Sequence, residues 1–476
     1  MSFLHGVEFL EKTPDRPISV VKSGVIALVG TAPKGAVQTL TLVQTEAQAA
    51  AFGKELTGFS IPQAIRAIYD QGVNATILVV NVFDPVTMLS ADQTEVRAFY
   101  DAAKTLTKTL YNPMNTVVVK KHDGSGATLT KDIDYTIDDF GNIKMLTYGP
   151  GNIVDPDLGI QVVYKKAEFG TIDATDIVGD NALGVRTGLQ LFDLSYNMFG
   201  FKAKVLIAPK YSQLTTVADE LQAKAVKYKA VALLDTPQAT TYEDMLTSRG
   251  IGGLFFRSTS RTVGCYPWVK VKNLDTGAIE VRPRSERLAG ILSNNDANSN
   301  KGFWTSPSNT VIEGIVGEEL DLTFDIQDAN TEVNYLNSIG IVTGANAYGV
   351  GILNWGNRNL AYPSNTSVES FINVRRTFDI VEESIGLSML QFIDVSNVTQ
   401  GSIDRVKDSV NDFIDILIGR GALVVGTKLS YNPNLNPPNQ LATGQVVFTL
   451  SGMSAIPIER MTFEVNFDVS LLNFAA

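Results

Sequence analysis

Residues 204–235 read KVLIAPKYSQLTTVADELQAKAVKYKAVALLD, and this stretch decides the fold class. Short apolar runs at its two ends, Lys204–Pro209 and Val231–Asp235, predict buried strands. The segment between them predicts a helix, because its apolar residues recur on one face: Leu214, Val217, Leu221, Ala225 and Tyr228. A strand, a helix and a second strand in this order favour parallel pairing through a right-handed crossover. The sequence therefore predicts a mixed α/β fold built on a parallel sheet.

The same alternation extends in both directions along the chain. Upstream, VIALVG at Val25–Gly30 and TILVVNVF at Thr76–Phe83 predict two more buried strands, with a helix after Ser60 between them. Downstream, a short helix at Tyr242–Arg249 leads to a predicted strand, GLFFR, at Gly253–Arg257. These segments extend the predicted α/β core over most of the first half of the chain.

An insertion interrupts this core. Ser90 and Gln93 have the spacing of a capping box and predict a helix with one apolar face: Val96, Phe99, Ala103, Leu106 and Leu110. From Thr116 to Lys166 the sequence consists of short runs in which apolar and polar residues alternate, separated by glycine-containing turns. This pattern predicts a small antiparallel β domain, inserted at residues 113–167.

The last third of the chain mixes helices and strands. Helices are predicted at Thr331–Ser338, at Phe378–Leu390 and at 403–418, the last capped by Ser402. The segment Ser370–Arg375 is strand-like, and strands are also predicted at Gln445–Leu450 and Met461–Val469, whereas the prolines of Asn432–Asn439 predict a loop. The final strand places five apolar residues on one side: Met461, Phe463, Val465, Phe467 and Val469.

Composition excludes several classes of protein. The 476 residues carry a net charge of −11, and one cysteine cannot form an intramolecular disulfide. We expect no nucleic-acid binding, because the chain is net acidic whereas nucleic-acid-binding proteins usually carry a basic stripe. We also expect no membrane span or signal peptide, because long apolar runs are missing. Charged residues make up only 19% of this predicted soluble chain, against roughly 25% in a typical domain. One explanation for the low charge density is that much of the surface does not face solvent.

Motifs for catalysis are incomplete. Gly30–Gly35 has the spacing of a phosphate loop but lacks the following Lys-Ser/Thr, and Gly349–Gly351 lacks the third glycine of a dinucleotide site. Cys265 is interpreted as a packing residue, and Glu382-Glu383 as part of a solvated face. We therefore expect a protein that is not an enzyme and that binds no cofactor or metal. Two segments are locally basic and fit either a solvated face or a docking surface for an acidic partner: Lys202–Lys229 and Arg257–Arg287.

Several short motifs occur in order from residue 266 onward: Tyr266-Pro267-Trp268, Gly302-Phe303-Trp304 with Pro307, Trp355-Gly356-Asn357-Arg358, Val374-Arg375-Arg376 and Ile456-Pro457-Ile458-Glu459. In these motifs the chain resembles contractile tail sheath proteins. His5-Gly6-Val7 and Phe52-Gly53 extend the resemblance to the N-terminal half. The chain departs from the usual pattern at Pro283, which stands alone, at Ser308 and at Asn359, and these departures affect local geometry and subfamily.

The resemblance implies subunits that polymerise as stacked rings around an inner tail tube, starting from a baseplate. The sheath then contracts and drives the tube through a bacterial envelope to deliver a genome. The implied partners are copies of the same chain, the inner tail tube protein, and the baseplate and tail terminator proteins. The implied location is the virion, after assembly in the host cytoplasm.

The resemblance also implies a division into domains. We expect an N-terminal arm at 1–22, a core in two parts at 23–112 and 168–265, and an outer β domain at 113–167. A conserved domain facing the tube follows at 266–440, and a C-terminal strand and arm at 441–476. Neither arm can fold alone, so we expect both to add strands to neighbouring subunits. The exchanged apolar residues would be Val7, Phe9, Ile18, Val20, Phe463, Val465, Phe467 and Val469.

The 403–418 helix is the candidate tube-facing element. Its polar side carries Arg405, Lys407, Asp408, Asn411 and Asp412, whose mixed charges predict a weak, salt-sensitive contact. An ordinary amphipathic surface helix remains an alternative. For the whole chain, three other readings remain open: the sheath of a bacteriocin or other injection particle without a genome, an α/β enzyme, and a capsid or adhesin-like protein.

Overall fold

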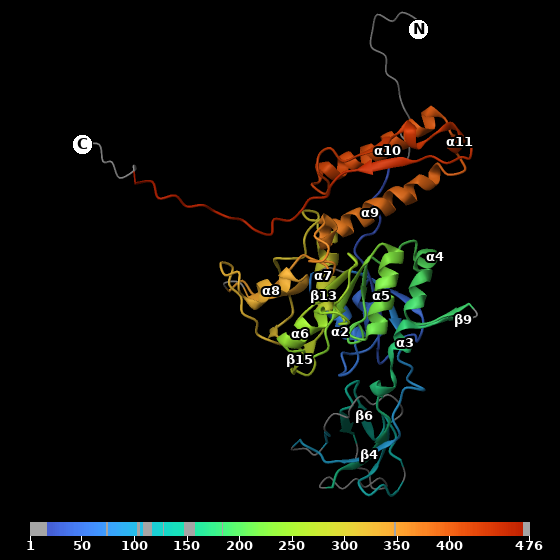
Figure 1. The fold of residues 1–476 in the computed structure, drawn as a ribbon. Helices are drawn as coiled ribbons and strands as arrows, with labels where there is room; N and C mark the ends of the chain where they lie inside the picture. Colours follow the sequence, from blue (N-terminus) through green and yellow to red (C-terminus); the bar gives the residue numbers. More distant parts are fainter. Residues whose placement is uncertain are drawn as a thin grey trace, which may run out of the picture.

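The computed structural model describes residues 17–72, 75–101, 105–107, 117–126, 128–146, 158–182, 184–346 and 349–469. A nine-stranded sheet of order β16-β19-β18-β13-β12-β11-β1-β3-β2 forms its centre (Figure 1). Six consecutive strands are parallel: β18 (Ile341–Asn346), β13 (Thr262–Cys265), β12 (Val231–Asp235), β11 (Val205–Ile207), β1 (Val25–Gly30) and β3 (Thr76–Asn81). Antiparallel strands form both edges: β2 (Leu40–Val43), β19 (Ile352–Trp355) and β16 (Thr310–Val311).

Helices cover both faces of this sheet. In β1, Val25 and Ala27 pack into one apolar cluster, whereas Ile26 and Leu28 pack into the other. The first cluster is covered by α3 (Ala174–Val178), α5 (Thr215–Tyr228), α6 (Tyr242–Arg249) and α8 (Glu332–Ser338). The second is covered by α1 (Glu46–Ala50), α2 (Ile61–Tyr69) and α7 (Arg284–Ala297). Strands buried on both faces read as continuous apolar runs, which is why the α/β prediction from residues 204–235 is confirmed.

The predicted strand at Gly253–Arg257 is wrong. Phe255 is fully buried, but its backbone lies in turns, and its N–H donates to the carbonyl of Ser248. Arg257 reaches back to Asp219 at 2.8 Å. Phe255 therefore packs into the first apolar cluster from a turn. The next strand of the sheet, β13, begins only at Thr262.

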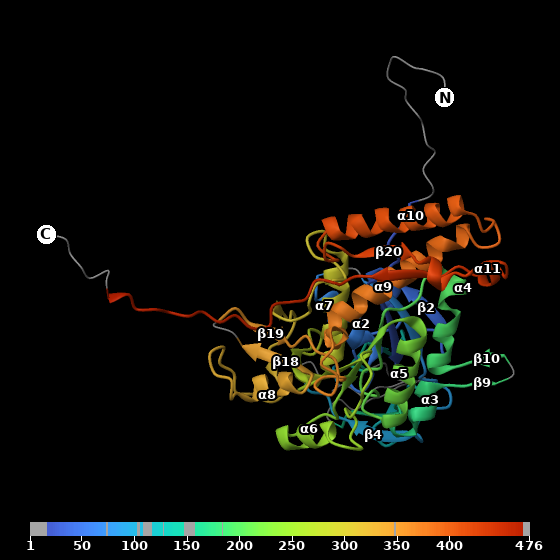
Figure 2. The same ribbon diagram turned by 45° about the horizontal axis from the view of Figure 1, so that its top comes forward.

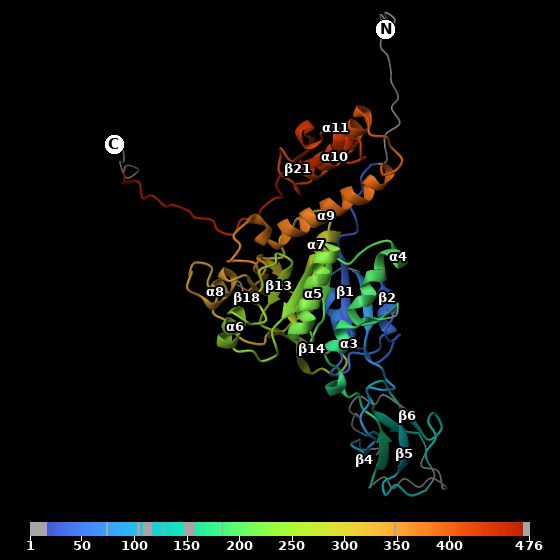
Figure 3. The same cartoon turned by 45° about the vertical axis from the view of Figure 1, so that its right-hand side comes forward.

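The inserted β unit extends away from the core, at the end of the molecule opposite α9 (Ile372–Ser388) and α10 (Gln400–Gly419) (Figure 3). It contains the three-stranded sheet β4 (Gln93–Arg97), β8 (Ile160–Tyr164) and β5 (Val118–Lys121), and the pair β6 (Tyr135–Ile137) and β7 (Ile143–Met145). A separate apolar cluster, which includes Val119 and Tyr164, forms its core.

The predicted helix that begins at Ser90 is wrong, and this unit begins well before residue 113. Residues 93–97 form β4, antiparallel to β8, with the β-branched Thr94 and Val96 that favour strands. The Ser90 hydroxyl does not cap a helix but accepts from the N–H of Lys166 at 3.2 Å. Phe99 and Leu106 form isolated β-bridges, while Ala103 and Leu110 lie outside the described residues.

The predicted boundary after residue 265 cuts through the main sheet. Strand β13 pairs in parallel with β18, which lies in the segment predicted as a separate domain. The same segment holds a small sheet of β14 (Val269–Lys272), β15 (Ile279–Arg282) and β17 (Gly317–Glu318). The core therefore extends to about residue 370, because parallel pairing joins strands that are distant in the sequence.

The C-terminal module lies over one end of the core (Figure 2). It consists of α9 (Ile372–Ser388), α10 (Gln400–Gly419), β20 (Lys428–Tyr431), α11 (Pro438–Leu441) and β21 (Phe448–Ser451). The strand-like prediction for Ser370–Arg375 is wrong, since this segment opens α9. The loop prediction for Asn432–Asn439 is wrong in part, because Pro433 and Pro438 begin short helical turns, a position that tolerates proline.

The remaining elements are short. They are β9 (Asn181–Ala182), β10 (Val185–Arg186), α4 (Ser195–Phe199) and the 3-10 turns η1 (Phe169–Thr171), η2 (Gly188–Leu194), η3 (Val368–Ser370), η4 (Met389–Gln391) and η5 (Pro433–Leu435). The β9–β10 hairpin projects from the side of the core next to α4 (Figure 2).

Candidate assembly surfaces

The chain leaves the C-terminal module as an extended segment that lies away from the rest of the molecule (Figures 1 and 2). We call residues 460–469 the C-terminal extension. Its apolar side chains are 69–93% exposed: Met461, Phe463, Val465, Phe467 and Val469. The strand predicted at Met461–Val469 does not form within this chain, because the described part of the chain offers it no ladder partner.

The root of the C-terminal extension is held firmly by Arg358. Its guanidinium donates two hydrogen bonds to the Glu459 carboxylate, at 2.8 and 2.6 Å. It also stacks over the ring of Phe371, 3.5 Å from the ring centre. Two of the sequence motifs, WGNR and IPIE, therefore meet in one contact that fixes where the extension starts.

The hairpin β20–β21 is the only sheet of the C-terminal module in the described residues. The outer edge of β21 has no ladder partner, whereas on the outer edge of β20 the Asn411 side chain binds the backbone of Leu429. One face packs on the helices through Leu429, Phe448 and Leu450. The other face is polar: Lys428, Ser430, Thr449 and Ser451. A two-stranded sheet is marginal by itself, and here α10 supports it from one side.

The described part of the N-terminal arm contacts its own chain. Ile18 is 7% exposed and, with Val20, packs into the apolar cluster formed by α9 and α10. The N–H of Val21 donates to the Ser384 hydroxyl of α9 at 3.0 Å. Ile18 and Val20 therefore complete the core of this chain instead of lying free for exchange. Val7 and Phe9 lie outside the described residues.

Helix α10 begins one turn earlier than predicted. Thr399 caps it, accepting from the N–H of Ser402, so Ser402 is the third helical residue and not the cap. On the outer side, Arg405, Asp408 and Asp412 are exposed. These three predicted tube-facing residues lie on an accessible surface of the C-terminal module.

The two other predicted tube-facing residues have partners within the chain. Lys407 is half-buried and pairs with Asp404 at 3.0 Å. Asn411 binds the backbone of Leu429 twice, donating to its carbonyl at 3.1 Å and accepting from its N–H at 2.8 Å. Asn411 thus joins the hairpin to α10, and its side chain belongs to the module interior.

Helix α9 is joined to the core by ion pairs that the sequence did not reveal. Arg376 meets Asp296 of α7 through two hydrogen bonds, at 3.1 and 2.7 Å, and both side chains are 2% exposed. Arg261, just before β13, pairs with Asp379, which also accepts from Arg375 at 2.8 Å. Both arginines of the V-R-R motif therefore act at this joint.

Lysines of the core complete the joint. Lys204 pairs with Glu383, and burial lowers the pKa of Lys204 although Glu383 acts to raise it. Lys229 pairs with Glu382 at 2.5 Å. The interpretation of Glu382-Glu383 as a solvated face is therefore wrong, because Glu383 is only 11% exposed. The basic segment that contains Lys204 and Lys229 meets the acidic residues of its own α9.

The aromatic motif residues fasten loops to the core. Tyr266 hydroxyl donates to the carbonyl of Thr240 at 3.1 Å, and Trp268 Nε1 donates to that of Thr236 at 2.8 Å. The intervening Tyr266-Pro267 peptide bond is cis. These contacts hold the chain after β13 against the loop after β12.

The other motif residues lie nearer the module. Trp304 packs edge-on against Phe303, and its carbonyl accepts from Asn373 of α9 at 2.9 Å. The carbonyl of Pro307 accepts from the side chain of Asn354 at 3.0 Å, and Trp355 packs edge-on against Phe324. Each of these motif residues thus contacts another segment of its own chain.

Buried acids lie at the carboxyl end of the parallel strands, the usual ligand crevice of open α/β sheets. Asp235, at the end of β12, accepts from the N–H and hydroxyl of Ser285 at 2.9 and 2.5 Å, and burial raises its pKa to about 6. Burial likewise raises the pKa of Glu286 to about 8. Ser285 and Glu286 both belong to the first turn of α7, which therefore fills this part of the crevice. Burial also raises the pKa of Cys265, in keeping with a packing role.

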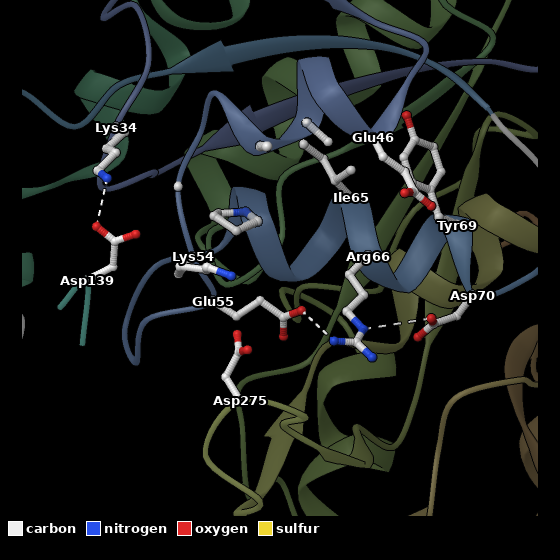
Figure 4. A pocket seen from close by; sticks show the side chains of 14 residues that line it. Lys34, Glu46, Lys54, Glu55, Ile65, Arg66, Tyr69, Asp70, Asp139 and Asp275 are labelled. Atoms are coloured by element: carbon white, nitrogen blue, oxygen red, sulfur yellow. Dashed lines mark hydrogen bonds and ion pairs between the residues drawn. The ribbon is translucent and has the colours of Figure 1, made fainter.

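A pocket of about 610 Å³ lies between α1, α2 and the inserted unit (Figure 4). Arg66 lies at its wall and pairs with Glu55 at 3.1 Å and with Asp70 at 3.8 Å. Across the pocket, Lys34 pairs with Asp139 of the inserted unit at 2.8 Å. Because the carboxylates of Glu55 and Asp70 are both engaged by Arg66, the pocket lacks the free carboxylates that an acid–base site would need there.

The described ranges also bear on metal binding and on membrane insertion. No three His, Cys, Asp or Glu side chains there are grouped as a metal site would need. No helix there has the length and apolar character for crossing a bilayer.

Comparisons with known proteins agree with the resemblance in sequence. Residues 184–360 match the profile of the phage tail sheath protein central domain. The chain is 40% identical over 467 residues to the tail sheath protein of Burkholderia phage BcepMu, covering 97% of this chain and 96% of that protein. A putative prophage major tail sheath protein of Pseudomonas aeruginosa strain UCBPP-PA14 is 30% identical over 307 residues, covering 64% of this chain and 76% of the relative.

Solved structures share the fold. The contracted helical sheath of the anti-feeding prophage matches with a TM-score of 0.60 at 15% identity, covering 98% of this chain and 100% of that chain. The contracted PVC sheath complex of an extracellular contractile injection system matches with a TM-score of 0.59 at 15% identity, covering 99% of each chain. With 40% identity to a tail sheath protein over nearly its whole length, the chain belongs to the family of contractile tail sheath proteins, as a structural subunit.

Proposed function

We propose that copies of this chain polymerise helically around an inner tail tube, and that contraction of the polymer drives the tube through a bacterial envelope to deliver a genome. One observation carries the proposal: the C-terminal extension presents five large apolar side chains, 69–93% exposed, on one side of an extended backbone. Burying each such side chain is worth about 1.5–3 kcal/mol. A second copy of the chain is the partner that a homopolymer supplies.

The acceptor that we propose is the open edge of β20–β21 in a neighbouring copy. The hairpin is apolar toward its helices and polar outside, and the C-terminal extension alternates in the same way. Added as a third strand, the extension would place Phe463, Val465 and Phe467 over the helices. Its polar residues, among them Glu464, would then lie on the face that carries Lys428. A third strand also converts a marginal hairpin into a stable sheet.

The test is a variant with Phe463→Ser, Val465→Ser and Phe467→Ser, matched by a control with Thr462→Ser and Asn466→Ser on the opposite side. We expect the apolar variant to fold with unchanged thermal unfolding but to form no tubes in negative-stain microscopy. The control should form tubes of normal length. Normal tubes from the apolar variant would contradict strand exchange.

The N-terminal arm is proposed as a second exchanged segment, restricted to residues before 17. Deletion of residues 1–16 should leave a folded chain that assembles poorly. Deletion of residues 1–18 should also lower the thermal stability of the monomer, since Ile18 is buried in its own chain. Equal assembly by the wild type and the 1–16 deletion would argue against exchange at this end.

Helix α10 is proposed as the tube-facing element. Arg405→Glu with Lys407→Glu should weaken co-sedimentation with purified tube and leave self-assembly intact. The matched control is Lys54→Glu with Lys272→Glu, which makes the same charge change at exposed positions of the core. If both pairs of substitutions behave alike, the assignment fails.

We propose that the assembled particle is a virion, built in the host cytoplasm, in which baseplate and terminator proteins close the two ends of the sheath. The phage relative at 40% identity favours genome delivery over a particle without a genome. Microscopy of particles purified from producing cells distinguishes the two: DNA-filled heads support genome delivery, and headless sheathed tubes support the alternative. In either case the chain acts through packing, without a catalytic step.

A further inference from the structure

A cationic aromatic surface surrounds α4, on one side of the core. We call it the α4 patch: Lys22, Tyr196, Met198, Phe199, Phe201 and Lys202. Lys22 Nζ lies 4.8 Å from the centre of the Phe201 ring, and Lys202 Nζ lies 5.7 Å from that of Tyr196. Met198 is 53% exposed. Large accessible side chains around a charge are typical of interface anchors.

The lysines of the α4 patch differ from the other cations in this part of the core. Lys204, Lys224 and Lys229 pair with acids of their own chain. Among the described residues, neither Lys22 nor Lys202 has an ion-pair partner. The α4 patch therefore retains positive charge for a partner outside this chain.

The opposite side of the core carries negative charge. The loop before α8, which we call the α8 loop, exposes Asp321, Asp325 and Asp328 together with Ile326, which is 59% exposed. None of the three aspartates forms an ion pair with a described residue. The α8 loop thus combines negative charge with an exposed apolar side chain, whereas the α4 patch combines positive charge with exposed or half-buried aromatic side chains.

The two surfaces lie toward opposite edges of the sheet in all three views (Figures 1, 2 and 3). Helix α8 contacts β18, the third strand of the sheet order, whereas η2, which leads into α4, contacts β3, the eighth. Five strand spacings of about 4.8 Å separate these strands by roughly 24 Å. A contact between unlike surfaces on opposite sides of a subunit is what a ring or helix of identical subunits requires.

We propose that the α8 loop of one subunit docks on the α4 patch of its neighbour, a second copy of this chain. This inference rests on the proposed homopolymer and adds a contact between core domains to the exchange of arms. Lys22 and Lys202 meet Asp325 and Asp328, while Ile326 covers the exposed part of the aromatic cluster. Complementary charges fix the register of neighbouring subunits and speed their association.

The test uses charge reversal and its rescue. One variant carries Lys22→Glu and Lys202→Glu, a second carries Asp325→Lys and Asp328→Lys, and a third carries all four substitutions. Each double variant places like charges across the contact, so we expect at least a tenfold rise in the concentration needed for tube formation. The fourfold variant restores opposite charges and should assemble nearly as the wild type does.

Mixing provides a second measurement. An equimolar mixture of the two double variants offers complementary contacts wherever they alternate, so the mixture should assemble although neither variant does alone. Lys272→Glu with Asp275→Lys, exposed at the end of β14 and in the turn after it, is the matched control and should leave assembly unchanged. All these positions are exposed or half-buried, so monomer folding, checked by thermal unfolding, should be unaffected.

The outcomes separate this inference from the proposed function. If the wild type forms no tubes, the proposed polymer itself fails. If the wild type forms tubes and both double variants form them equally well, the polymer stands and the core contact is wrong. Assembly defects in the double variants that the fourfold variant does not repair would also overturn the pairing.

Discussion

The nine-stranded sheet and the hairpin β20–β21 differ in what they need from outside the chain. The sheet has nine strands and apolar clusters on both faces, and it ends in the short antiparallel strands β16 and β2. The hairpin has two strands, one covered face and an outer edge at β21 that has no ladder partner. One chain thus combines a self-sufficient core with a module that a neighbour can complete. The first region folds without a neighbour, and the second offers the edge for the proposed strand exchange.

The joint between the two regions should give the largest effect. Arg376→Ala leaves Asp296 buried without its cation, and breaking such a pair costs about 3–5 kcal/mol. Urea unfolding of the purified chain measures this loss. The double variant Arg376→Met with Asp296→Leu removes both charges and should recover most of it. If both variants lose the same stability, the cost arises from packing and not from the uncompensated charge.

The core itself should respond to pH through Glu286. Burial raises its pKa to about 8 from 4.5, against the opposing effect of Arg282, Arg287 and Lys210. A raised folded-state pKa gives stability that is complete below about pH 4.5 and is lost as the pH rises toward about 8. Asp235, with a pKa of about 6, contributes with the same sign.

Glu286→Gln removes this titration. The variant should exceed the wild type in free energy of unfolding by under about 1 kcal/mol at pH 5 and by roughly 3 kcal/mol at pH 7. Urea titrations at the two pH values measure the difference. A difference that does not change with pH would show that Glu286 stays ionised and paired in the folded chain.

Within the module, Asn411→Ala should loosen the hairpin. The substitution leaves the N–H and carbonyl of Leu429 without their side-chain partner, which costs about 1–3 kcal/mol. Hydrogen exchange at residues 428–431 and 448–451 should accelerate while β1 and β12 stay protected. Asp412→Ala, one residue along on the exposed side, is the control and should change neither. Equal acceleration in β12 would contradict the independence of the two regions.

The smallest effect is expected at the inserted unit. Lys34 and Asp139, 58% and 50% exposed, form an ion pair between it and the core. Because water screens such pairs, Lys34→Ala should cost at most about 1 kcal/mol. Thermal unfolding of the variant and of Lys131→Ala, an exposed lysine within the unit, should be nearly the same. A larger loss for Lys34→Ala would mean that this pair fixes the unit to the core.

Burial on both faces decides which strands the sequence could predict. Strands such as β1 and β12 are buried on both faces, so their apolar runs were read correctly. The run GLFFR lies in turns instead, with Phe255 buried and Phe256 53% exposed, because a short apolar run does not fix the backbone conformation. The helix predicted from Ser90 failed because the hydroxyl meets Lys166, a partner 76 residues away.

The candidate surfaces were predictable only where the pattern is local. The alternation at Met461–Val469 is visible in the sequence, and so is the amphipathic helix that became α10. The pairing of Arg376 with Asp296 and of Lys204 with Glu383 joins residues 80 and 179 positions apart. Their only signal was local excess charge, which fits a solvated face equally well. Asn411 was assigned to the outer surface because helical spacing cannot show that β20 lies beside it.

The alternation of the C-terminal extension has a consequence for the free subunit. An exposed apolar strand with an open backbone is a hazard, since copies of it can stack into amyloid-like fibrils. In such a parallel, in-register stack, Glu464 and Asp468 would repeat every 4.7–4.8 Å and repel one another. In the proposed exchange the same two carboxylates would instead lie on the hairpin face that carries Lys428, Ser430 and Thr449. The acidic side of the strand would thus disfavour amyloid-like stacking without blocking the proposed addition to a neighbour's hairpin.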